Sequence, residues 1–195
     1  MKDTKKITLA AIFIALMFAL GYTPVGTIPL FAGASMTTIF IPVAIGIVLL
    51  DDFKYSLALG IGFGAVMFMK VIVPYPASGL LDPYFINPLI SVLPRILVAV
   101  VGYFIYRGLS KIKVNTLKYA VFGAIIPLLN TLFTLSALFI FNSSEVSEIM
   151  GLSIISVLGL ILLTNALPEL VLGTVVTPAV AVTIEKVKNR RNKED

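Results

Sequence analysis

Long apolar runs alternate along this chain with short polar segments, and these segments hold nearly all of its basic residues. Of the 15 Lys and Arg residues, only Lys70 and Arg95 lie within or beside an apolar run. Hydrophobic residues make up 58% of the chain, charged residues make up 13%, and the mean hydropathy is +1.03. An apolar run of about 20 residues crosses a bilayer as a helix, and segments rich in Lys and Arg stay on the cytoplasmic side. We therefore expect an all-α membrane protein.

The apolar runs predict six transmembrane helices in one bundle. An even number of crossings leaves both termini in the cytoplasm, together with the polar turns at 51–54 and 107–118. The first run could instead be a cleaved signal peptide, but no convincing small-residue cleavage site follows it, so we interpret it as a span. The chain is thus predicted to be a multi-pass protein of the cell membrane with one domain over residues 1–195. We place the spans at residues 7–22, 36–50, 53–72, 86–107, 117–141 and 165–187.

The apolar stretch at residues 149–187 is too long for one crossing. As continuous helix it would extend about 58 Å, whereas the hydrocarbon core is about 30 Å thick. Pro168 lacks a backbone donor and disfavours helix before it, so we expect a break at residues 164–169. Residues 150–163 would then form an outer-leaflet or re-entrant helix, and the last span would begin near Asn165. An ordinary proline kink is the alternative.

Several polar side chains fall in the outward half of the predicted bundle and are candidate walls of a ligand pocket. A cation inside a span is costly and usually faces a polar interior or a ligand, which makes Arg95 the leading candidate. Arg95 and Asn130 would lie about 12 and 16 Å below the outer ends of their helices. Asn165 and Glu169 are one helical turn apart and share a face, and Lys70 approaches the same level. This set suits a small polar solute with an anionic end.

Each of these side chains also has a purely structural interpretation. Arg95 and Glu169 could form a buried ion pair that ties two helices together. Asn130 and Asn165 could form hydrogen bonds between helices, which are common in membrane bundles. Lys70 could extend its amine to the outer interface.

The two outer loops at residues 23–35 and 74–87 are rich in Gly and Pro and also contain many apolar residues. Because apolar loops normally cover something, we expect them to fold over the outward pocket as a lid. Aromatic rings would exclude water from a bound solute, so Phe31 and Tyr84 are candidate contacts. Anchoring of Tyr75 and Tyr84 at the lipid interface is the competing interpretation.

On the first span, Ala11, Ala15 and Ala19 recur at every fourth position and form a smooth strip on one helical face. Strips of small residues permit close approach of two helices. The strip could pack within the molecule, or it could dock on another membrane subunit.

Other functions are disfavoured by what the chain lacks. With no Cys and no His there is no thiolate or imidazole chemistry, and we predict no metal, no cofactor and no enzymatic activity. An intramembrane enzyme using Glu169 would lack an accompanying nucleophile or metal cluster. A stand-alone channel or facilitator would need polar residues along a full path, and the inward halves of the spans have almost none. The basic residues beside apolar runs indicate orientation and anionic-lipid contact, not nucleic-acid binding.

Three short motifs resemble those of the substrate-binding S components of energy-coupling factor (ECF) vitamin transporters. They are Leu93-Pro94-Arg95-Ile96-Leu97-Val98, Asn130-Thr131-Leu132 and Thr164-Asn165-Ala166-Leu167-Pro168-Glu169. Their order and separation are similar to the pantothenate-type subgroup. The resemblance extends over nearly the whole chain, including the alanine strip and an Ile28-Pro29-Leu30 outer loop.

The resemblance implies a high-affinity binding subunit for a water-soluble vitamin or precursor, with an outward pocket near spans four to six that two loops cap. It also implies that the strip of Ala11, Ala15 and Ala19 docks on a transmembrane coupling (T) subunit driven by two cytoplasmic ATPase subunits. Family members are thought to transport by toppling in the membrane. The chain has no Walker A loop, which agrees with a separate ATP-driven motor.

The resemblance makes pantothenate the first choice of solute. Its carboxylate suits Arg95, its amide suits Asn130 or Asn165, and its hydroxyls suit Glu169. Pyridoxine, hydroxymethylpyrimidine and niacin could use the same groups and remain open. The absence of Trp argues mildly against a large flat ligand such as riboflavin.

Overall fold

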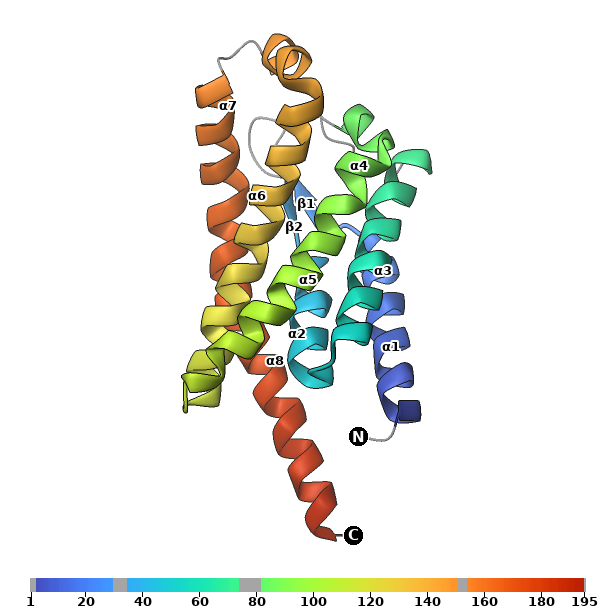
Figure 1. Ribbon diagram of the computed structural model, residues 1–195, viewed down its shortest axis with the longest axis vertical. Helices are drawn as coiled ribbons and strands as arrows, with labels where there is room; N and C mark the ends of the chain where they lie inside the picture. The colour runs from blue at the N-terminus through green and yellow to red at the C-terminus, as the bar shows by residue number, and fades with distance from the viewer. Residues whose placement is uncertain (1–2, 30–34, 74–81, 151–153, 195) are drawn as a thin grey trace.

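A bundle of apolar helices makes up most of the computed structural model, which describes residues 3–29, 35–73, 82–150 and 154–194 (Figure 1). Five helical stretches in these residues are long and apolar enough to cross a membrane: Asp3–Gly21, Phe53–Ile72, Pro88–Lys111, Asn115–Asn142 and Gly159–Val187. The predicted class, an all-α multi-pass membrane protein, is confirmed. In chain order the elements are α1 (Asp3–Gly21), β1 (Thr27–Pro29), β2 (Ser35–Thr37), α2 (Phe40–Leu50), α3 (Phe53–Ile72), η2 (Asp82–Ile86), α4 (Pro88–Ser91), α5 (Leu93–Gly108), η3 (Leu109–Lys111), α6 (Asn115–Met150), α7 (Ile154–Ile161), η4 (Leu162–Ala166) and α8 (Leu167–Glu194).

The short helix α2 forms the centre of the bundle. It is apolar on all sides, and Phe40, Val43 and Ile47 have no exposed surface. Helices α1, α3, α5, α6 and α8 all contact it. With 11 residues it extends only about 16 Å, so the predicted span at residues 36–50 is too long. Residues 35–37 of the predicted span instead form strand β2. This strand pairs with β1, and the backbone N–H of its Thr37 donates to Glu169 on α8.

Helices α6 and α8 cross at two glycines. A Cβ atom built on Gly123 would lie 2.1 Å from the carbonyl oxygen of Gly173, and the reverse distance is also 2.1 Å. The two backbones are therefore in direct contact, which a side chain at either position would prevent. Both helices run side by side in opposite directions (Figure 1).

The stretch at residues 149–187 does not break as the sequence predicted. In the described residues 154–194, α7 continues into the π-helix η4, and η4 continues directly into α8. The backbone N–H of Leu167 bonds to the carbonyl of Leu162, five residues earlier, and Pro168 follows at once. Pro168, which has no backbone N–H, thus lies where the π-helix returns to an α-helix. The helix can therefore continue through this proline without a break. In the described residues from Ile154 onward, the helix expected to be separate at 150–163 is therefore continuous with the last span through this π-helical segment.

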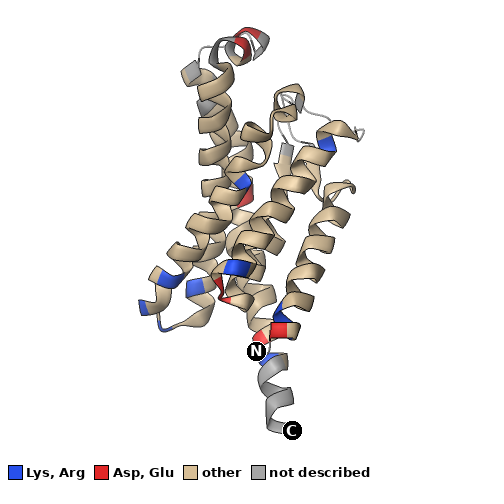
Figure 2. Ribbon diagram, turned by 45° about the vertical axis from the view of Figure 1, so that its right-hand side comes forward, with Lys and Arg blue, Asp and Glu red and all other residues tan. Residues whose placement is uncertain are grey.

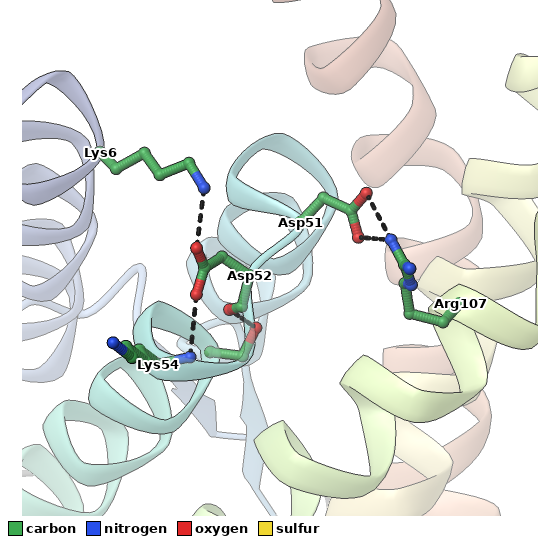
Figure 3. Close-up of polar contacts among 6 residues, drawn as sticks. Lys6, Asp51, Asp52, Lys54 and Arg107 are labelled. Carbon is green, nitrogen blue, oxygen red and sulfur yellow. Dashed lines mark hydrogen bonds and ion pairs between the residues drawn. The ribbon is translucent and has the colours of Figure 1, made fainter. Parts of the chain in front are cut away.

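Helix α1 begins and helix α8 ends at the same end of the bundle, which we name the terminal end (Figure 1). The turns between α2 and α3 and between α5 and α6 also lie there, and Figure 2 shows many of the charged residues at this end. Asp52 accepts hydrogen bonds from Lys6 Nζ at 2.8 Å and from the backbone N–H of Lys54 at 3.1 Å (Figure 3). Arg107 Nη1 lies 3.3 Å from Asp51 Oδ2. The α2–α3 turn is therefore tied to α1 and α5 by ion pairs.

Candidate functional site

A two-stranded hairpin that the sequence did not predict lies within the first outer loop. Strands β1 and β2 are antiparallel, and Thr27 stands opposite Thr37. The backbone N–H of Thr37 donates to Glu169 Oε1 of α8 at 2.7 Å, and Lys70 Nζ of α3 donates to the Thr27 hydroxyl. Thr27 and Thr37, which stand opposite each other in the hairpin, are therefore each bonded to a charged side chain from a different helix. We name these two residues the Thr27–Thr37 rung. β-branched residues near the Gly/Pro-rich segment were the only local signal for it.

Arg95 is buried at the start of α5, with 3% of its surface exposed. Its Nη1 donates to the carbonyl oxygen of Ile90 at 2.8 Å, which satisfies a backbone group at the end of α4. The guanidinium carbon lies 5.2 Å from the ring centroid of Phe85 and 6.0 Å from that of Phe63. Its Nε is buried without a hydrogen-bond partner. The guanidinium is thus positioned by aromatic rings and one carbonyl, and keeps a free donor.

Glu169 is buried in the first turn of α8, with 2% of its surface exposed. One carboxylate oxygen accepts from Thr37, while the other, Oε2, is buried and has no partner. The opposite charges of Glu169 and Arg95 interact electrostatically, but within the described residues no direct ion pair joins them. The structural interpretation of a buried interhelical ion pair is therefore not what the structure shows.

Two polar side chains of α6 also carry buried oxygens without partners. They are Asn130 Oδ1 and Thr134 Oγ1, four residues apart and therefore on one helical face. An unpaired buried polar group costs about 1–3 kcal/mol, and such groups are rare in native proteins. We name Arg95, Asn130, Thr134 and Glu169 the unpaired polar set. The sequence pointed to all of them except Thr134.

The crossing of α6 and α8 shows that members of this set lie at similar depth. Measured from the two glycines, Asn130 is about 10 Å and Glu169 about 6 Å along the helix axes, both away from the terminal end. Thr134 is about 16 Å along in the same direction. Thr177, whose buried hydroxyl is also unpaired, lies about 6 Å in the opposite direction and is not part of the set.

The remaining predicted pocket residues have different surroundings. Asn165 is half-buried in η4, and the Thr164 hydroxyl lies 3.2 Å from its Oδ1. Tyr84 packs on a small apolar cluster that includes Ile90, and desolvation followed by nearby carboxylates raises the pKa of its hydroxyl. The ring that contacts Arg95 from η2 is therefore Phe85, not Tyr84. Phe31 lies outside the described residues.

The alanine strip points away from the bundle. Ala11, Ala15 and Ala19 are exposed, whereas Phe13 and Met17 on the other face of α1 are buried. The strip is thus available to lipid or to a partner helix and is not used for packing within this chain.

Apolar crossing helices around buried, partly unpaired polar groups define a multi-pass membrane protein with a candidate polar binding site. A comparison with protein-family descriptions finds no match for this chain. The chain is similar to the pantothenic acid transporter PanT of Lactococcus lactis subsp. cremoris (strain MG1363), with 28% identity over 212 aligned positions that cover 97% of this chain and 99% of PanT. This end-to-end similarity to a transporter of pantothenic acid confirms the resemblance to the pantothenate-type S components.

Proposed function

We propose that this protein is the substrate-binding S component of an ECF-type transporter, acts as one domain over its whole length, and takes up pantothenate. The similarity to PanT along nearly the full chain supports the substrate class. The observation that carries the site is the pair of buried, oppositely charged side chains, Arg95 and Glu169, each with a polar atom that has no partner. A ligand that satisfies both atoms would remove two desolvation costs at once.

The chemistry of pantothenate matches these free atoms. Its carboxylate can accept from the guanidinium of Arg95, and its hydroxyls can donate to Glu169 Oε2. Its amide N–H can donate to Asn130 Oδ1, while the hydroxyl of Thr134 can donate or accept. In this proposal Asn165, Tyr84 and Phe31 complete the wall and lid.

Lys70 takes a supporting role in this proposal. Its amine donates to the hydroxyl of Thr27, so Lys70 positions the hairpin. The amine itself lies at the edge of the proposed pocket, beside the solute. Glu169 accepts a hydrogen bond from Thr37 of β2 through Oε1 and offers Oε2 to the solute. One carboxylate would therefore couple solute binding to the position of the hairpin. The hairpin would thereby exclude water from the bound vitamin.

Uptake needs an energy source, and we assign it to partners. The exposed strip of Ala11, Ala15 and Ala19 is the surface proposed to dock on the transmembrane coupling subunit, which two cytoplasmic ATPase subunits drive. Small residues allow close helix approach, so Ala15→Trp should block uptake and leave solute binding intact. Co-purification with the coupling subunit that survives this change would place the docking surface elsewhere.

The substrate assignment is tested by calorimetry with two matched solutes. Pantothenol differs from pantothenate in carrying a hydroxymethyl group instead of the carboxylate. We expect the purified protein to bind pantothenate about 100-fold more tightly, because a charge-assisted contact with a buried guanidinium is worth several kcal/mol. Equal affinities would contradict the carboxylate assignment. If the protein binds pyridoxine, hydroxymethylpyrimidine or niacin tightly and does not bind pantothenate, the bound vitamin is the substrate and the pantothenate assignment is wrong.

A further inference from the structure

A second candidate site lies at the terminal end, away from the unpaired polar set. A pocket of about 260 Å³ opens between the α2–α3 turn, the end of α5, η3 and the start of α6. Arg107 at its edge is 12 residues beyond Arg95, which is about 18 Å of helical rise. The pocket is lined by Asp51, Tyr106, Arg107, Ser110 and Lys118.

The pocket carries an excess of positive charge. It contains two cations and one carboxylate, and residues 107–118 include four basic residues and no acidic one. Arg107 Nη1 lies 3.3 and 3.5 Å from the two oxygens of Asp51, and both side chains are about half exposed, at 60% and 45%. Such a long, exposed ion pair is worth about 0–1 kcal/mol, so Arg107 can share its donors with another anion.

The two cations are placed to bind one anion together. The Lys118 amine lies 4.0 Å from the ring centroid of Tyr106, a cation–π contact that fixes the amine while its N–H groups stay available. Arg107 uses one nitrogen toward Asp51, and its fork retains further donors. Ser110 adds a hydroxyl at the same pocket. A guanidinium, an ammonium and a hydroxyl around one cavity are the donors that a phosphate group requires.

The surface beside the pocket indicates where that phosphate comes from. Phe104, Val114 and Leu117 are large apolar residues with 61%, 60% and 54% of their surface exposed. Phe104 lies one helical turn before Arg107 on α5, Val114 directly precedes α6, and Leu117 is the neighbour of Lys118 in the first turn of α6. An acyl chain can lie along this surface while its headgroup occupies the pocket. Basic pockets between helices at the cytoplasmic side of a membrane bind anionic headgroups in this way.

We propose that this pocket binds the phosphodiester headgroup of an anionic phospholipid, with Arg107 and Lys118 as its charged ligands. Native mass spectrometry of the detergent-purified protein, titrated with phosphatidylglycerol or phosphatidylcholine, measures the affinity for each lipid. We expect phosphatidylglycerol to bind more tightly. Lys118→Gln and Arg107→Gln should each weaken it about fivefold, the effect of one basic residue near an anionic headgroup.

Matched variants separate a defined pocket from diffuse charge. Lys113→Gln removes a cation from the same loop but outside the pocket lining, so phosphatidylglycerol affinity should not change. Asp51→Asn removes the competing carboxylate, and Asn tolerates the left-handed backbone at this position, where φ is 43°, so the affinity should rise. An equal loss in Lys113→Gln and Lys118→Gln, or no gain in Asp51→Asn, would overturn the proposal.

A final measurement distinguishes lipid from free phosphate. Inorganic phosphate is added in excess at matched ionic strength, with chloride as the reference salt. Retention of phosphatidylglycerol supports a lipid site that uses both headgroup and chain. Displacement of the lipid by phosphate would show that the pocket selects the free anion, and the lipid assignment would then be wrong.

Discussion

Glu169 and Glu185 both lie on helix α8, and the fold treats these two glutamates differently. Glu185 lies near the terminal end and accepts hydrogen bonds from the hydroxyl of Tyr119 and the amide of Asn115. Glu169 is buried about one helical turn from the glycine crossing, on the side away from the terminal end, and only one of its oxygens is bonded. The same contrast holds between Arg107, which is exposed and paired, and Arg95, which is buried and keeps an unused donor.

The contrast distinguishes polar groups that hold the fold from those that await a partner. At the terminal end, water can solvate the charged side chains, yet many of them also pair with other side chains of this protein. Inside the bundle, where an unpaired group costs about 1–3 kcal/mol, several atoms are left without partners. A fold that only needed stability would reverse this distribution, which supports the proposal that the buried set binds a ligand.

The largest effect expected from this contrast is at the two arginines. Arg95→Ala removes the guanidinium proposed to bind the carboxylate, and pantothenate affinity should fall at least about 100-fold. Arg107→Ala removes an equal charge at the terminal end and should leave affinity unchanged. Isothermal titration of both variants with pantothenate checks this. Arg95→Ala should also lose the discrimination between pantothenate and pantothenol. Pantothenate binding that survives Arg95→Ala would break the comparison.

The two glutamates provide the next test. Glu169→Gln keeps the shape and an acceptor for Thr37 but replaces Oε2 or Oε1 with a donor, so pantothenate affinity should fall about tenfold. Glu185→Gln should not alter affinity, since the oxygens of Glu185 bond to side chains of α6 near the terminal end, away from the unpaired polar set. Equal losses in the two variants, measured by the same titration, would mean that α8 responds as a whole and not through one carboxylate.

A smaller effect is expected at the hairpin. Thr27→Val removes the hydroxyl that Lys70 binds, which loosens the rung shared with Thr37 and should speed solute release about fivefold. Thr23→Val is the control, because the Thr23 hydroxyl donates to the carbonyl of Leu20 in the same segment and not to the hairpin. Dissociation of radiolabelled pantothenate, chased with unlabelled solute, gives the rates. Identical rates in wild type and Thr27→Val would show that the rung does not retain the solute.

The smallest effect concerns the ion pairs of the terminal end. The hydrogen bond from Lys6 lowers the pKa of Asp52 below its ordinary value. Protonation therefore favours the unfolded chain: the stabilisation is full above the ordinary carboxyl pKa and is lost as the pH falls through the lowered value. Because the two side chains are only partly buried and water screens their charges, acidification below about pH 4 should reduce Tm through this group by less than about 4 °C. Lys6→Gln should lose this sensitivity and Lys5→Gln should keep it.

The sequence predicted burial well where one residue's own chemistry decides it. Arg95, Asn130 and Glu169 were expected inside the bundle because lipid excludes such groups, and all three are buried. Whether they bind a solute stays a prediction. The apolar runs likewise predicted the long spans, since length and hydropathy are local properties.

Features that depend on distant partners were not predictable in this way. The hairpin is held in part by a bond between residues 132 positions apart, from Thr37 to Glu169. The rings beside Arg95 come from two other elements, α3 and η2. The helix passes through Leu162–Ala166 as a π-helix directly before Pro168, whereas proline rules predict only a break or a kink there.

The position of α2 limits how a carrier of this shape can work. Because five neighbours enclose this short rod, it cannot slide past one of them without opening a hollow in the middle of the molecule. For the proposed carrier, the packing around α2 thus favours rotation of the whole body over sliding of its helices, and the proposed coupling and ATPase subunits would drive that rotation.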